Sequence, residues 1–423
     1  MSKPSTAAGM PDELQRRLGL SDAVMIGLGA MIGAGIFAAL APAAHAAGSG
    51  LLIGLAVAAM VAFCNATSSA RLAARYPASG GTYIYGRERL GDFWGYLAGW
   101  SFVVGKTASC AAMALTVGSY VWPGQAYAVA VAAVVALTVV NYAGVQKSAL
   151  LTRLIVAVVL AVLAAVVVAS LTSATAEAAR LDVGADATAG GVLQAAGLLF
   201  FAFAGYARIA TLGEEVRDPA RTIPHAIPLA LGITLVVYAV VAVAVLTVLG
   251  PNRLAQAAAP LSDAVRAAGV GRLAPVVRVG AAVAALGSLL ALILGVSRTT
   301  LAMARDRHLP RALAAVHPRF KVPHRAELLV GAVVAVLAAT ADLRGAIGFS
   351  SFGVLVYYAI ANASAFTLTP AEGRPARIIP VVGLAGCLVL AFALPLSSVI
   401  SGAAVLALGA AAYGARRLII AQG

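Results

Sequence analysis

The chain has 423 residues, of which 61% are hydrophobic and 11% charged, and its formal net charge is +14. Soluble domains are about half apolar and a quarter charged, so this composition excludes a soluble protein. The apolar runs reach about 20 residues, the length of a bilayer-spanning helix, which excludes an outer-membrane β-barrel. We therefore expect an all-α integral membrane protein.

Hydropathy and turn residues predict about 12 membrane-spanning helices. They are expected at residues 20–47, 51–73, 92–120, 127–145, 153–172, 190–212, 224–249, 273–301, 326–341, 346–369, 378–395 and 397–415. If the N-terminus is cytoplasmic, the outside loops contain only five basic residues, namely Arg180, Arg253, Arg266, Arg272 and Arg344. This distribution follows the positive-inside rule and predicts that both termini are cytoplasmic. The basic residues are expected to face anionic lipid rather than nucleic acid.

Other sequence signals are weak. The 19 residues before the first span are polar, and no cleavage site follows the first apolar run, so no cleaved signal peptide is expected. Cys64, Cys110 and Cys387 lie singly in predicted spans and are expected to pack as small apolar residues. The five histidines form no ligand-spaced pair, so neither a metal site nor a cofactor is predicted.

Two predicted spans are interrupted by glycine. The first contains GLGAMIGAGIF at residues 27–37, and the sixth contains FFAFAGYARIATLGEE at 200–215, with Gly205 near its middle. One such stretch alone could mean only that two helices pack closely. Each interrupted span, however, comes first in a block of five, and two consecutive blocks of five cross the membrane in opposite senses. Paired interrupted helices in inverted halves indicate the binding site of a secondary transporter.

A helix broken inside the membrane exposes unpaired backbone groups. Amide N–H groups start its second half, and carbonyl groups end its first half. These groups are too costly to face lipid, but they can face a ligand. The N–H end attracts an anion such as a carboxylate, and the carbonyl end attracts an ammonium group.

Three blocks together resemble the amino acid/polyamine/organocation (APC) superfamily of permeases over nearly the whole chain. They are GAMIGAGIF at 29–37, YPASGGTYIYGRERLGDFWGYLAGW at 76–100 and FFAFAGYARIATLGEEVRDPARTIPHAI at 200–227. The resemblance implies two inverted five-helix repeats, two further helices and alternating access to a central amino acid site. The implied units are the cytoplasmic tail 1–19, the repeats 20–172 and 190–369, the last spans within 378–415 and the cytoplasmic tail 416–423.

The resemblance also implies the substrate-binding positions. In the first span, the amides of residues 33–35 would hold the substrate carboxylate, beside the end of the first half-helix at 31–32. In the sixth span, the carbonyls of residues 203–205 would meet the substrate amine. The residues concerned are Met31, Ile32, Gly33, Ala34, Gly35, Phe203, Ala204 and Gly205. Phe201 matches an aromatic gate above the site, and its alternative role is ordinary packing.

Lys106 and Arg208 are ionisable residues inside predicted spans. Such a residue costs about 2.5–3.5 kcal/mol near the bilayer centre, so it needs a partner or a cavity. Lys106 is expected either to gain and lose a proton as a coupling residue or to act as a latch on backbone carbonyls. Asp22 and Glu214 lie near the cytoplasmic ends and could pair with Arg208. Because no acidic residue is expected as deep as Lys106, the predicted substrate is a neutral or acidic amino acid or another small carboxylate.

The connecting segments also give expectations. Residues 76–91 are expected to form a loop with a tight turn, in which Tyr83 and Tyr85 anchor at the membrane interface. The outside segments 173–189 and 251–272 are expected to be short helices over the bundle.

The function predicted from these observations is secondary active transport of amino acids across the inner membrane of a bacterium, without enzymatic activity. Proton symport and amino acid exchange both remain open, as does a nutrient receptor that binds without transport. A membrane enzyme would need clustered Asp, Glu or His residues. Direct drive by ATP would need a nucleotide-binding motif, which the sequence lacks. The sequence predicts no oligomeric state.

Overall fold

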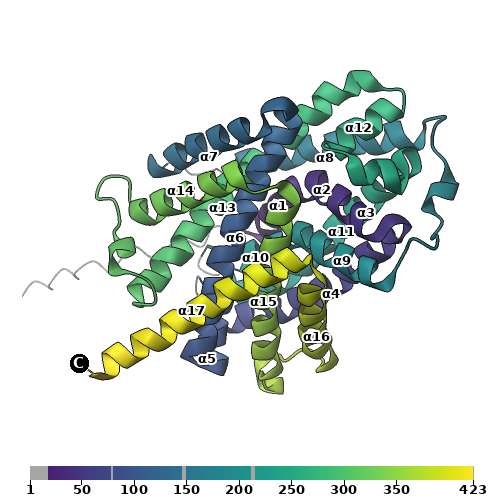
Figure 1. Cartoon of the computed structure of the whole chain (residues 1–423). Helices are drawn as coiled ribbons and strands as arrows, with labels where there is room; N and C mark the ends of the chain where they lie inside the picture. Colours follow the sequence, from purple (N-terminus) through teal and green to yellow (C-terminus); the bar gives the residue numbers. More distant parts are fainter. Residues whose placement is uncertain (1–17, 78–79, 145–148, 211–214, 423) are drawn as a thin grey trace, which may run out of the picture.

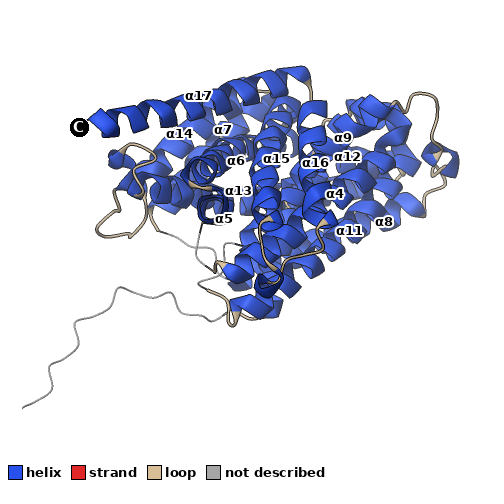
Figure 2. Ribbon diagram, turned by 90° about the horizontal axis from the view of Figure 1, so that it is seen from below, coloured by secondary structure: helices blue, strands red, loops and turns tan. Residues whose placement is uncertain are grey.

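The structure is a computed structural model that describes residues 18–77, 80–144, 149–210 and 215–422. These ranges are helical with short connections, and their β-type pairing is a single bridge between Leu18 and Val216 (Figures 1 and 2). Within the described residues, ten helical segments are long and apolar enough to cross a membrane. The all-α membrane fold is thus confirmed. A total of 12 spans stays a prediction, because α14 and α16 have only 17 and 16 residues.

The helices follow the predicted order along the chain. The first half contains α1 (Leu20–Met31), α2 (Ala34–Ala38), α3 (Leu40–Ala47), α4 (Leu51–Arg75), α5 (Thr82–Leu90), α6 (Asp92–Val121), α7 (Ala126–Tyr142) and α8 (Ala149–Leu171). The remainder contains α9 (Ala189–Phe203), the 3-10 turn η4 (Ala204–Tyr206), α10 (Ala207–Ala210), α11 (Pro219–Gln256), α12 (Pro260–Ala267), α13 (Ala274–Arg305), α14 (His324–Thr340), α15 (Leu343–Phe366), α16 (Ile378–Ala393) and α17 (Leu396–Gln422). Most ends agree with the predicted spans within a few residues. Helix α17 continues beyond the predicted span at 397–415 to Gln422, and the cytoplasmic tail expected at 416–423 stays a prediction.

Helix α6 lies at the centre of the bundle and packs against α15, α13, α5 and α7. Its crossing with α15 is made by two glycines. A Cβ atom on Gly353 would lie 2.9 Å from Gly105 Cα, so the two backbones touch. Small residues permit such close crossings between membrane helices. Helix α17 lies across α6 and α15 on the outside of the bundle (Figure 1).

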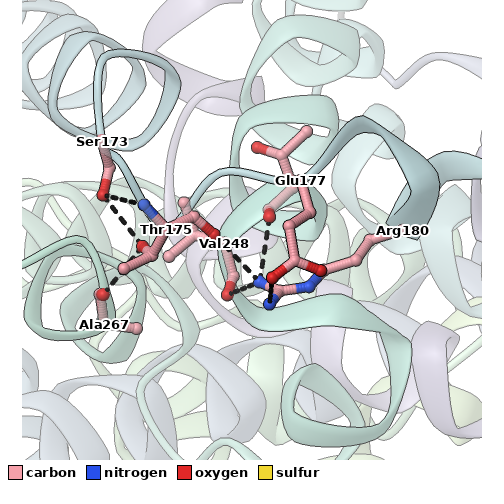
Figure 3. A network of polar contacts seen from close by, with 7 residues as sticks. Ser173, Thr175, Glu177, Arg180, Val248 and Ala267 are labelled. Carbon is pink, nitrogen blue, oxygen red and sulfur yellow. Dashed lines mark hydrogen bonds and ion pairs between the residues drawn. The ribbon is translucent and has the colours of Figure 1, made fainter.

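One end of the bundle, here called the α12 face, is closed by the connection between α8 and α9. Figure 3 shows Arg180 at the centre of this contact. Its Nη1 donates to Thr247 O at 3.0 Å and to Val248 O, and its Nη2 lies 2.6 Å from Glu177 Oε1. These carbonyls lie directly before the bend of α11 at Gly250, whose φ is 67°. Arg180 therefore caps the membrane part of α11.

The same connection also contacts α12. Thr175 Oγ1 donates to Ala267 O at 3.1 Å (Figure 3). Ser173 Oγ donates to the neighbouring carbonyl, Ala268 O, at 3.0 Å. The expected short helix in 251–272 is confirmed as α12, whereas 173–189 contains only the 3-10 turn η3 (Ala178–Leu181) and the start of α9.

The opposite end, the α5 face, corrects the expectation for residues 76–91. Most of this segment is helix α5, and the side chains of Tyr83 and Tyr85 are only 2% and 1% exposed. They are not interfacial anchors, because α5 folds back against α6 and α15. Tyr83 Oη donates to Asp306 Oδ2 at 2.6 Å, and Tyr357 Oη accepts from the amide of Thr82 at 3.0 Å.

Asp22, one of the two acids that the sequence suggests as partners of Arg208, has a different ion-pair partner. Asp22, in the first turn of α1, pairs with Arg153 of α8, because these two helices pack side by side. Glu214 and nearly all of the N-terminal tail lie outside the described residues. The three cysteines are buried and free, as expected.

Candidate functional site

The first interruption lies where the glycines predict it. Helix α1 ends at Met31, and Ile32 and Gly33 have non-helical torsions, with φ and ψ of −79° and 53° and of −107° and −133°. The amide of Gly33 turns back to donate to Met31 O at 2.8 Å. The helix resumes at Ala34 as α2. The break is therefore a local reversal of two residues inside a buried segment.

The second interruption is a change of helix type. Helix α9 ends at Phe203, the 3-10 turn η4 follows over Ala204–Tyr206, and α10 begins at Ala207. The predicted interruption at Gly205 is present as this tightened turn rather than as an open gap. Tightening changes the direction of the chain and frees carbonyl groups at the end of α9.

The two interruptions lie in direct backbone contact. A Cβ atom on Gly205 would lie 2.3 Å from Ala30 O and 2.7 Å from Met31 N. A Cβ atom on Gly35 would lie 2.6 Å from Ala202 Cα. No other residue type fits at either position without moving backbone atoms. Residues about 170 positions apart along the chain therefore form one buried centre.

Tyr238 of α11 bridges the two interruptions through its hydroxyl group. This group lies 2.6 Å from Met31 O and 3.1 Å from Ala202 O. A phenol has one proton to donate, so the two carbonyls share it. The ring packs against Phe203, with ring centroids 5.2 Å apart.

Lys106 reaches the same centre from α6. Its side chain is 7% exposed, and Nζ donates to Ala204 O at 3.2 Å. Tyr358 of α15 donates to the same oxygen at 3.4 Å. Of the two alternatives for Lys106, this contact agrees with the latch on backbone carbonyls. The coupling role stays a prediction.

Ser288 of α13 covers the first interruption. Its Oγ donates to Gly29 O at 3.3 Å, and it would lie 2.1 Å from a Cβ atom on Gly33. Ser288, Tyr238 and Tyr358 were not predicted from the sequence. Their signal was a hydroxyl group inside an otherwise apolar span, where it needs a hydrogen-bond partner.

The structure brings all eight predicted binding positions together at these interruptions. Phe201 lies two residues before Phe203 in α9, is 7% exposed and packs in the core. Arg208 lies in α10 and is partly buried. Substrate binding, the gate at Phe201 and the role of Arg208 stay predictions.

Glu327 is a buried acid that the sequence interpretation missed. It lies in the first turn of α14 and is 0% exposed, and neither carboxylate oxygen has a hydrogen-bond partner among the described residues. Because it occupies the second position of the predicted ninth span, it looks like an ordinary boundary residue. An unpaired carboxylate in such a place is costly.

The chain was compared with known proteins. A family model described as "Amino acid permease" matches residues 18–412. An uncharacterized transporter of Mycobacterium tuberculosis is 81% identical over 419 residues, which cover 99% of this chain and 95% of that protein. The branched-chain amino acid permease of Bacillus subtilis is 25% identical, with 89% and 88% covered. Human cationic amino acid transporter 4 is 28% identical, with 90% and 65% covered. The resemblance to APC permeases is confirmed: the chain belongs to the amino acid permease family and is a multi-pass membrane transporter.

Proposed function

We propose that this transporter moves neutral or acidic amino acids across the cytoplasmic membrane by alternating access, with both termini in the cytoplasm. In this proposal residues 20–172 and 190–369 are the inverted repeats. The proposal rests mainly on the buried contact between the interruptions at Ile32–Gly33 and Gly205. Backbone amides and carbonyls converge at this contact. They are buried in the protein, whereas unpaired backbone groups that face lipid would be strongly destabilising.

The substrate would use both kinds of backbone group. Its carboxylate would be held by the amides of Gly33, Ala34 and Gly35, beside Met31 and Ile32. Its ammonium group would meet the carbonyls of residues 203–205, at the negative end of α9. Phe201 would cover the bound molecule from outside. The contact between the interruptions would open to admit the substrate, because Gly205 now touches Ala30 O.

The charge at the centre supports the substrate class. Lys106 is buried there, and no described Asp or Glu lies within ion-pair distance of it. A second cation would be repelled, whereas a zwitterion or an anion would not. The names of the relatives do not decide this point, because one refers to branched-chain and the other to cationic amino acids.

Counterflow in proteoliposomes tests the proposal. Vesicles are loaded with one unlabelled amino acid at a time, and uptake of its labelled form is followed with and without a pH gradient. We expect uptake of neutral or acidic amino acids. Acceleration by an acidic outside would identify proton symport, and uptake that needs internal amino acid and ignores pH would identify exchange. Failure of all twenty amino acids, beside a working control carrier, would contradict amino acid transport.

A pair of glycine variants links uptake to the site. Gly205→Val places its side chain against Ala30 O and should abolish uptake. Gly232→Val lies in α11, where a Cβ atom meets nothing within 4 Å, and should retain it. Both proteins are first checked for a single monodisperse peak. Full uptake by Gly205→Val would contradict the proposed position of the site.

A further inference from the structure

The carbonyl of Ala204 already accepts from two side chains of the protein. It follows the last residue of α9, where the helix dipole makes carbonyl oxygens attractive to cations. Its oxygen accepts from two side chains, Lys106 Nζ at 3.2 Å and Tyr358 Oη at 3.4 Å. A substrate ammonium group therefore finds this acceptor occupied by an ammonium group of the protein.

The cost of burying Lys106 indicates that the contact matters for function. Its side chain is 7% exposed, and within the described part of the chain it has no acidic partner. A buried ammonium group without a carboxylate is expensive, and one carbonyl hydrogen bond offsets only part of that cost. A leucine or methionine at this position would pack in α6 without this cost.

We propose that Lys106 is an internal ammonium group that occupies the amine subsite until a substrate displaces it from Ala204 O, and that its charge then excludes cationic substrates. This inference rests on the proposed function and adds the residue that determines selectivity. After displacement, the carboxylate of a zwitterion or an anion compensates the charge of Lys106. A cationic amino acid or a diamine leaves one positive charge uncompensated.

The expected size of the effect follows from Coulomb's law. Two unit charges about 5 Å apart, at an effective dielectric constant of about 20, repel strongly enough to weaken binding on the order of a hundredfold. Rearrangement of the site reduces this factor, so a relative gain of tenfold or more on removing the charge is the expected result.

The test measures ligand binding to purified protein in detergent by thermal stabilisation. The ligands are the twenty standard amino acids and putrescine. Wild type should bind neutral or acidic amino acids and reject lysine, arginine and putrescine. Lys106→Met should reduce the preference for the best neutral amino acid over lysine, arginine and putrescine by tenfold or more. Lys106→Gln should do the same, because glutamine is uncharged and still donates an N–H group to Ala204 O.

Arg278→Met is the matched control. Arg278 is another cation within a predicted span, in α13, and its Nε donates to Tyr120 O at 2.7 Å, away from the interruptions. This variant should keep the wild-type preference. If both Lys106 variants bind amino acids with a preference within twofold of wild type, the inference is overturned while amino acid binding stands. If wild type binds none of the ligands, the proposed function and the inference both fail.

Discussion

Tyr238 shows how much of the centre depends on one atom. Its hydroxyl oxygen contacts a carbonyl from each interrupted span, and the side chain is 1% exposed. Without the hydroxyl group, the buried carbonyls of Met31 and Ala202 would both lose the hydrogen-bond donor of this side chain. The contact therefore stabilises the closed arrangement of the two interruptions.

We predict that Tyr238→Phe lowers both stability and uptake. A buried polar group left without its partner costs about 1–3 kcal/mol. The melting temperature in detergent and the initial rate of counterflow should both fall. Tyr127→Phe is the control, because Tyr127 of α7 is 50% exposed, and it should leave both values unchanged. An unchanged melting temperature for Tyr238→Phe would show that the hydroxyl group contributes nothing to the closed arrangement.

For Glu327 we predict the opposite effect, a substitution that raises the melting temperature. Replacing this unpaired, fully buried carboxylate with the neutral Glu327→Gln side chain should stabilise the protein by about 1 kcal/mol or more, seen as a higher melting temperature. Glu88→Gln is the control, because Glu88 is 47% exposed and should shift the value little. A lower melting temperature for Glu327→Gln would mean that the negative charge is stabilising where it lies.

At the residue scale, the sequence predicted the backbone of the site better than its side chains. Gly33, Gly35 and Gly205 are visible in the sequence because an apolar span tolerates glycine only for a reason. Tyr238 and Tyr358 were missed because their partners are carbonyls of distant spans. The carbonyl that each hydroxyl reaches depends on how the helices pack, and no local pattern encodes it.

At the scale of helices, the crossing of α6 and α15 depends on the absence of side chains at Gly105 and Gly353. This contact holds α6, which supplies Lys106, against α15, which supplies Tyr358. The two donors to Ala204 O therefore come from helices whose separation is set by two glycines.

We expect Gly353→Ala to lower the melting temperature, although alanine is the better helix former by about 1 kcal/mol. The new Cβ atom would lie 2.9 Å from Gly105 Cα and 3.0 Å from Ser101 O, so the helices must separate. Gly232→Ala makes the same exchange in α11 with nothing within 4 Å and should raise the melting temperature. Equal shifts in the two variants would show that the crossing is not tightly packed.

Helix order was predictable because about 20 apolar residues are needed to span a bilayer. Helix α5 was missed because Pro77, Gly80 and Gly81 indicate a turn, and Gly80 and Gly81 do have positive φ. The segment after them becomes helical because Tyr83 and Tyr85 pack into the bundle, a tertiary effect that hydropathy does not report. Helix α17 extends beyond the predicted span to Gln422, and in that extension Arg417 lies 3.6 Å from Asp92 of α6, a contact between distant segments that hydropathy does not report.

At the scale of the whole molecule, the α5 face joins distant parts of the chain around His308. His308 Nδ1 lies 2.8 Å from Tyr83 Oη, which donates to Asp306, and the imidazole contacts the rings of Tyr96 and Tyr413. The charged groups that face it are Arg87 of α5, Asp92 of α6, Asp306 after α13 and Arg416 of α17. Burial and the charge of Arg416 lower the pKa of His308 from its usual 6.5, against the opposing effect of Asp306.

This shift predicts acid sensitivity. Below pH 6.5 the unfolded chain binds a proton at His308 more readily than the folded protein, so stability should fall as pH falls. His308→Gln should show a smaller decrease in melting temperature than wild type between pH 7 and pH 5. His45→Gln, at an exposed histidine in α3, should retain the wild-type decrease. Parallel curves for wild type and His308→Gln would contradict this account.

The bridge between Leu18 and Val216 has a mechanical consequence. Leu18 donates to Glu215 O at 3.0 Å and accepts from Arg217 N at 2.9 Å, so the chain before α1 is clipped to the chain before α11. Any movement of the start of α1 relative to the start of α11 would have to break these two hydrogen bonds or carry residues 215–217 along with Leu18.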